Sequence, residues 1–226
     1  MNEAAFLFDT AWRLLGGVPL TLQLAAVSVA AGAVLALGLT LLRASSRPGG
    51  AVVSAYVFVF RGSPLLVQIF LIYYGLGQFP WVRASALWPF LRQPWWCAAL
   101  ALALNTAAYG SEIIRGGLAS VPPGAVEAAR ALGLTRWQAM RHVILPLALR
   151  QALPGYGNEV VIMVKATALA STITLMELTG VARALASETF RAVEVFLCAG
   201  AIYLALNALV AGGVRLVERR LAVPGL

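Results

Sequence analysis

Residues 18–42 read VPLTLQLAAVSVAAGAVLALGLTLL, and this stretch decides the fold because it contains no charged side chain. A helix that crosses a membrane needs about 20 mostly apolar residues, since each residue rises about 1.5 Å and the hydrocarbon layer is about 30 Å thick. An unbroken apolar run of this length would be poorly solvated in water. It therefore predicts a membrane-spanning helix.

The composition of the whole chain agrees with this interpretation. Hydrophobic residues make up 61% of the 226 residues, charged residues make up 12%, and the mean hydropathy is +0.84. Soluble domains carry about 25% charged residues. The net charge of +8 does not indicate nucleic-acid binding, because such proteins place a basic face on a polar domain and this chain has none. The partner that this surface needs is membrane lipid.

Four further stretches are long and apolar enough to cross a membrane, and they lie at about 51–77, 95–114, 147–170 and 195–217. The chain is therefore expected to be an all-α membrane protein of about five spans, forming a single transmembrane domain over residues 1–226. The second span contains Arg61, followed by Gly62, Ser63 and Pro64, and a proline bends a helix by removing a backbone donor. We expect one kinked span there; a re-entrant piece plus a span is the alternative.

The arginines indicate the orientation, because cytoplasmic loops carry an excess of positive charge. With the N-terminus outside, the inner segments hold Arg43, Arg47, Arg115, Arg130, Arg136, Arg141, Arg150, Arg215, Arg219 and Arg220, and the outer segments hold Arg13, Arg83, Arg92, Arg183 and Arg191. This excess predicts an external N-terminus and a cytoplasmic C-terminus. The opening MNEAAFLFDTAWRLLGG lacks the basic start of a cleavable signal. The first span is therefore expected to remain in the mature protein.

The segment 115–146, RGGLASVPPGAVEAARALGLTRWQAMRHVILP, is too polar to span and falls on the cytoplasmic side. Pro122 and Pro123 suit a helix start, and AVEAARAL consists of strong helix formers. Gly133 stands where that helix would end. Thr135 and Gln138 then have the spacing of a capping box, which opens a second helix. The pattern predicts two short helices joined at a glycine, between the third and fourth spans.

Within this segment, Glu127-Ala128-Ala129, three residues, Gly133, nine residues, and then Val143-Ile144-Leu145-Pro146 resemble the EAA loop of ABC-importer permeases. The usual first residue of the closing motif is Ile, and here it is Val143. The stretches 61–77, 105–134 and 153–180 resemble polar amino acid permeases. The resemblance covers nearly the whole chain and is weakest over residues 1–17 and 78–94.

This resemblance implies the type I ABC importer permease fold and a location in the bacterial cytoplasmic (inner) membrane, where such proteins move polar amino acids by alternating access. The residues that would couple the permease to its ATPase are Glu127, Ala128, Ala129, Gly133, Leu145 and Pro146. The implied partners are an ABC ATPase dimer, a second permease, identical or homologous, and an extracytoplasmic solute-binding protein. The variant KATALAS at 165–171 is similar to members that serve histidine, basic amino acids or opines, which suggests a basic substrate.

Several side chains are candidates for a substrate pathway, because polar groups within spans usually face a cavity or a partner. They are Arg61, Glu112, Glu159, Lys165, Thr167 and Ser171. Structural alternatives stand beside them. Glu112 could pair with Arg115, Arg61 could fix the kink, Lys165 could extend to the membrane interface, and the hydroxyls could bond neighbouring spans.

No residue pattern indicates catalysis. The chain lacks the GxxxxGK[ST] phosphate-binding loop, so a separate subunit is expected to hydrolyse ATP, and no cofactor or metal is expected here. Cys97 and Cys198 have no metal or disulfide spacing, and the single His142 lacks a partner. A membrane enzyme would need clustered His, Asp or Cys residues. A structural or assembly subunit of another membrane complex would explain the hydrophobicity, but not the EAA spacing.

Overall fold

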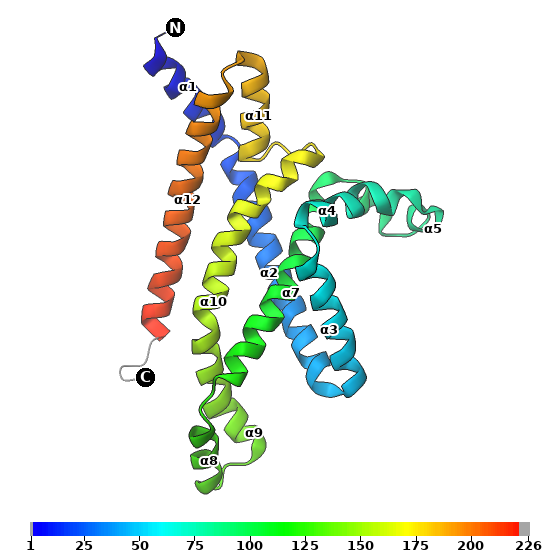
Figure 1. Ribbon diagram of the computed structural model, residues 1–226, viewed down its shortest axis with the longest axis vertical. Coiled ribbons are helices and arrows are strands. Elements are labelled where there is room, and N and C mark those ends of the chain that lie inside the picture. Colours follow the sequence, from blue (N-terminus) through cyan, green and yellow to red (C-terminus); the bar gives the residue numbers. More distant parts are fainter. Residues whose placement is uncertain (1, 222–226) are drawn as a thin grey trace.

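The computed structural model describes residues 2–221, which are mainly helical and contain no strand, and this confirms the all-α class. Figure 1 shows long helices running roughly along one direction, with shorter helices at both ends. The α-helices are α1 (Glu3–Leu15), α2 (Val18–Ser45), α3 (Arg47–Gly62), α4 (Leu65–Phe70), α5 (Pro80–Arg83), α6 (Trp88–Leu91), α7 (Pro94–Ala119), α8 (Pro123–Ala131), α9 (Arg136–Ala139), α10 (Leu145–Ala166), α11 (Leu178–Thr189) and α12 (Ala192–Leu221). Two π-helical turns, η1 (Leu71–Gly75) and η3 (Met140–Ile144), and two 3₁₀ segments, η2 (Leu76–Gln78) and η4 (Thr167–Ile173), complete the set.

Three helical segments are long and apolar enough to cross a membrane alone: Glu3–Ser45, which joins α1 to α2, then α7, and then α12. Two bent pairs, α3 with α4–η2 and α9–η4 with α11, bring the number of possible spans to five. The expectation of about five spans is therefore met. Helix α1 and helix α11 are additions to the expected set.

The break in the second span lies where the sequence places Gly62, Ser63 and Pro64, but its angle of 104° makes it a sharp turn rather than a kink. Two buried amides hold this turn. The Gln68 Nε2 donates to the Phe60 carbonyl at 2.8 Å and to the Ser63 carbonyl at 3.1 Å, and the Asn105 Nδ2 donates to the Phe60 carbonyl at 3.2 Å. These bonds satisfy the Phe60 carbonyl oxygen, which Pro64 leaves without a helical partner, and the Ser63 carbonyl oxygen at the break.

Helix α7 lies between α2, α3 and α10, and it supplies much of the buried interior (Figure 1). Most of its buried residues are small, and they include Ala98, Ala101, Ala103, Ala107 and Ala108. Small side chains let helix backbones approach closely, which is how helices pack when lipid removes the hydrophobic drive between them. On the facing side of α2, a Cβ atom added to Gly32 would lie 2.6 Å from Cγ2 of Thr106 and 3.1 Å from the Ala103 carbonyl oxygen.

We expect Gly32→Ala to lower the free energy of unfolding by about 1–3 kcal/mol, the usual cost of overpacking a close contact. Gly38 lies on the same helix, but a Cβ atom there would meet nothing within 4 Å. Gly38→Ala is therefore the matched control, and its effect should stay within about 0.5 kcal/mol. Thermal unfolding in detergent measures both variants. Equal loss in the two would contradict the close α2–α7 approach.

At the opposite end of the bundle from α8 and α9, helix α10 continues as η4, and the chain then turns into α11, which packs with α1 and α12 (Figure 1). Leu14, Leu178, Leu185 and Val195 form the buried apolar centre of this packing. Glu177 begins α11 and is fully buried. Its carboxylate accepts from the amides of Thr179 at 2.9 Å and Gly180 at 2.8 Å, and from the hydroxyl of Tyr203 at 2.8 Å.

Candidate functional site

The segment between α7 and α10 projects from one end of the bundle (Figure 1). As the sequence predicts, it contains two short helices, α8 and α9, joined through Gly133, and the turn η3 then leads into α10. We call residues 123–144 the coupling segment. Leu145 and Pro146 open α10 directly after it.

Two sets of hydrogen bonds make the coupling segment stiff. Gly133 has a φ of +76°. Its amide donates to the Arg130 carbonyl at 2.9 Å, and the amide of Leu134 donates to the Ala129 carbonyl at 3.1 Å, which is the Schellman pattern of a helix end. On the other side, Thr135 and Gln138 form the full capping box that opens α9. The joint therefore has a fixed geometry on both sides of the glycine.

The coupling segment turns one face inward and one face outward. Ala129 and Ala139 are buried against the rest of the segment, and Glu127 and Ala128 are exposed. Leu132 is 80% exposed and Trp137 is 71% exposed. Sequence reasoning singled out the Glu-Ala-Ala motif but missed these two large apolar side chains. The available signal was a leucine and a tryptophan within a segment too polar to enter the membrane.

We expect Gly133→Ala to strain the joint by about 1 kcal/mol, because a Cβ atom disfavours the left-handed conformation. Amide hydrogen exchange over residues 123–139 should accelerate about fivefold, which corresponds to that free energy. Gly124→Ala is the control, since a Cβ atom at Gly124 meets nothing within 4 Å and its φ is not positive. Unchanged exchange in Gly133→Ala would contradict the stiff joint.

Glu159 and Arg61 are two candidates that lie on different helices, α10 and α3, both of which pack against α7. Glu159 lies on α10, is 5% exposed and faces Thr106 of α7. Arg61 lies in the last turn of α3, where its guanidinium carbon stands 4.9 Å from the centre of the Tyr109 ring on α7. Helix α7 therefore has a carboxylate of α10 near its Thr106 and a guanidinium of α3 over its Tyr109 ring.

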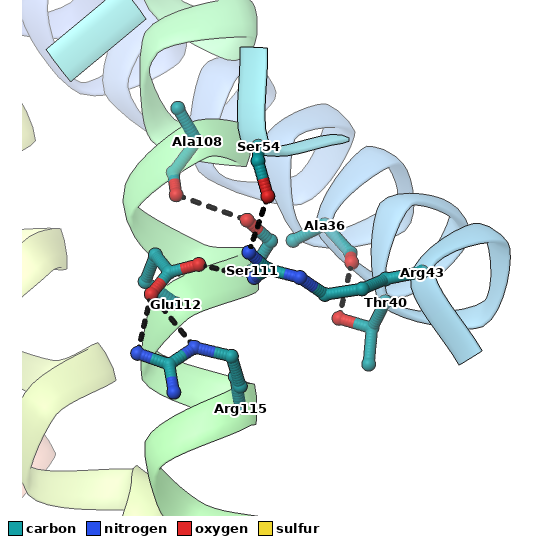
Figure 2. Close-up of polar contacts among 8 residues, drawn as sticks. All are labelled: Ala36, Thr40, Arg43, Ser54, Ala108, Ser111, Glu112 and Arg115. Carbon is teal, nitrogen blue, oxygen red and sulfur yellow. Dashed lines mark hydrogen bonds and ion pairs between the residues drawn. The ribbon is translucent and has the colours of Figure 1, made fainter. Parts of the chain in front are cut away.

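Glu112 takes part in ion pairs rather than standing alone, as Figure 2 shows. Its Oε1 accepts from Arg43 Nη1 at 2.5 Å, and its Oε2 accepts from Arg115 Nη2 at 2.7 Å and from Arg115 Nε at 2.8 Å. The pair with Arg115 is the structural alternative that the sequence suggested. The pair with Arg43 comes from a residue 69 positions away, which sequence reasoning did not find.

The remaining candidates lie near the other end of α10. Lys165 is exposed, and Thr167 is buried with its hydroxyl bonded to the Val164 carbonyl at 2.8 Å, which occupies its donor. Ser171 lines a hollow of about 330 Å³ together with Arg183 of α11. The Arg183 Nη1 also donates to the Ser171 carbonyl at 3.3 Å. Ser171 thus belongs to the η4–α11 surface, apart from the group around Glu159.

Known proteins resemble this chain in sequence and in structure over almost its whole length. Residues 17–223 match the family model described as the binding-protein-dependent transport system inner membrane component. The octopine transport system permease protein of Rhizobium meliloti is 60% identical over 221 residues, covering 96% of this chain and 89% of that protein. The arginine ABC transporter permease protein of Haemophilus influenzae is 43% identical over 205 residues, covering 90% of both. A chain in the crystal structure of an amino acid ABC transporter with histidines superposes with a TM-score of 0.86 at 37% identity, covering 97% of this chain and 99% of that one.

Proposed function

Because the chain belongs to the family of binding-protein-dependent transport system inner membrane components, we propose that it forms the membrane pathway of an importer for arginine-type amino acids. The family and the relatives make it a permease subunit of an amino acid ABC importer in the inner membrane. The finer proposal concerns the substrate, the residues that meet it and the partners that drive it.

Glu159 is the observation that carries the proposed substrate class. Two of the relatives are named for the transport of octopine and arginine. Both compounds contain a guanidinium group and a carboxylate. A buried carboxylate is costly unless a cation or hydrogen-bond donors satisfy it. Glu159 is 5% exposed, and a guanidinium in transit would supply both charge and donors.

Arg61 is the proposed counterpart for the carboxylate end of the substrate. Guanidinium groups bind carboxylates through two parallel hydrogen bonds, and the Arg61 guanidinium is exposed above the Tyr109 ring of α7. Lys165, exposed further along α10, is a second cation for the same end. Thr167 and Ser171 remain proposals for this pathway, although the Thr167 hydroxyl is already bonded within its own helix. Both carboxylate oxygens of Glu112 are occupied by ion pairs with Arg43 and Arg115, so we do not propose a substrate contact for it.

The coupling segment is the proposed docking site for an ABC ATPase dimer. Exposed Glu127, Ala128, Leu132 and Trp137 supply a mixed polar and apolar face, which is typical of a protein interface. In this proposal the N-terminus lies outside, a solute-binding protein delivers the substrate there, and a second permease completes the pathway. The ATPase subunits hydrolyse ATP, and this chain binds no cofactor itself.

Reconstitution tests the proposal directly. The permease is placed in lipid vesicles with its ATPase and its solute-binding protein, and ATP hydrolysis is measured as single amino acids are added. Arginine or octopine should stimulate hydrolysis, whereas glutamine and glutamate should not. Stimulation by glutamate alone would overturn the cationic substrate class, and no response to any amino acid would overturn the pathway proposal as a whole.

A further inference from the structure

Helix α3 is held to the bundle more by polar contacts than by apolar packing. Gly49 and Val53 are its buried residues, whereas Phe58 is 80% exposed and Val52 is 60% exposed. In lipid, apolar side chains gain little by moving from the bilayer onto another helix. The position of α3 therefore depends on hydrogen bonds and ion pairs that α3 makes or receives.

One guanidinium connects α3 to two other helices, as Figure 2 shows. Arg43, in the last turn of α2, donates from Nη1 to Oε1 of Glu112 on α7 at 2.5 Å and from Nη2 to Oγ of Ser54 on α3 at 2.9 Å. The side chains of Arg43 and Glu112 are 29% and 16% exposed. Partial desolvation strengthens such a pair beyond the small worth of a fully exposed one.

The position of this bridge is mechanically informative. Helix α7 runs without a break from Pro94 to Ala119 and is followed, after three residues, by α8 of the coupling segment. Glu112 lies about two turns before the end of α7. In the last turn of α3, the Arg61 guanidinium stands over the Tyr109 ring of α7. The α2–α3 hairpin thus extends from the coupling end of the bundle to the proposed substrate site.

We propose that Arg43 is a positioning residue: its bridge from Glu112 to Ser54 makes the α2–α3 hairpin move together with α7 when the coupling segment is displaced. The inference rests on the proposed function, because it assumes that an ATPase displaces that segment. Arg115 has a different part. It holds the second oxygen of Glu112 from the same helix, so it orients the carboxylate without joining α7 to the hairpin.

The two arginines give a matched pair of variants. Arg43→Gln removes the charged bridge from α2 to both α7 and α3, whereas Arg115→Gln removes an ion pair within α7. In vesicles with the ATPase and the solute-binding protein, the measured quantity is substrate transported per ATP hydrolysed. Arg43→Gln should lower this ratio about tenfold, within the range of coupling between charged side chains in contact, with the substrate KM unchanged. Arg115→Gln should lower it less than about twofold, as expected for a half-exposed pair.

Two more variants separate coupling from damage to the fold. Exchange of the charges, Arg43→Glu with Glu112→Arg in an Arg115→Gln background that avoids two adjacent cations, should restore most of the lost ratio, which a general packing defect would not allow. Ser54→Ala removes the α3 end of the bridge and should lower the ratio about threefold, at the low end of coupling energies between residues in contact. This variant keeps the hydrogen bond from the Tyr56 hydroxyl to the Leu104 carbonyl, at 2.6 Å, which still joins α3 to α7.

An unchanged ratio in both Arg43→Gln and Ser54→Ala would overturn the proposal, as would equal losses in Arg43→Gln and Arg115→Gln. If Arg43→Gln fails to assemble, the Ser54→Ala result decides. The ratio is measured with whichever amino acid stimulates the wild-type complex. A wrong substrate class would therefore appear in the wild type, and a wrong bridge would appear only in the variants.

Discussion

Trp137→Ala is expected to weaken binding of the ATPase to the permease about 30-fold, since loss of a central tryptophan costs about 2 kcal/mol or more at a protein interface. Trp137 is 71% exposed in α9, and Leu132, 80% exposed, lies just before the Gly133 joint. Both side chains leave apolar surface uncovered at the coupling end, which a partner would bury. Affinity of the purified ATPase for the permease in nanodiscs measures the change.

Trp12→Ala provides the control for that experiment. Trp12 is 68% exposed, nearly the same as Trp137, but it lies on α1 at the far end of the molecule (Figure 1). Its loss should leave ATPase affinity unchanged. Equal weakening by the two substitutions would indicate a general effect on the protein, and unchanged affinity in Trp137→Ala would remove α9 from the docking face.

Hydropathy predicted the long helices well because a membrane helix must satisfy its own backbone and face lipid along its whole length. Hydropathy missed α1 and α11 because these two helices are short and carry charged side chains. The segment Glu3–Leu15 contains Asp9 and Arg13, and the segment Leu178–Thr189 contains Arg183 and Glu188. Neither resembles a span. Their helicity depends on packing against α12, and on the Glu177 carboxylate that caps α11.

The coupling segment was predictable because its signals are local. Prolines, a glycine and the Thr135–Gln138 capping box lie within a few residues of each other, so sequence spacing alone fixes the two helices. The angle at Pro64 was not predictable in this way. It depends on Gln68 and on Asn105, which is 45 positions from the carbonyl it bonds. The Arg43–Glu112 pair is similarly a product of tertiary structure.

Glu159→Gln is expected to reduce arginine uptake efficiency about 100-fold, because loss of one partner of a desolvated charge pair costs roughly 2–5 kcal/mol. The substitution keeps the size of the side chain, but it removes the charge that would face the substrate guanidinium. Uptake of labelled arginine into vesicles that contain ATP, the ATPase and the binding protein measures kcat/KM. Glu188→Gln is the matched control, since Glu188 is 57% exposed and pairs with Arg13 away from the pathway.

Citrulline separates recognition of charge from damage to the pathway, because it has nearly the shape of arginine with a neutral urea group in place of the guanidinium. A direct contact between Glu159 and the substrate cation requires that Glu159→Gln reduce arginine uptake far more than citrulline uptake, which narrows the preference between the two substrates. Parallel losses for both would assign Glu159 a structural role between α7 and α10. The buried carboxylate would then stabilise the α7–α10 contact, and recognition of the guanidinium would have to come from another part of the importer.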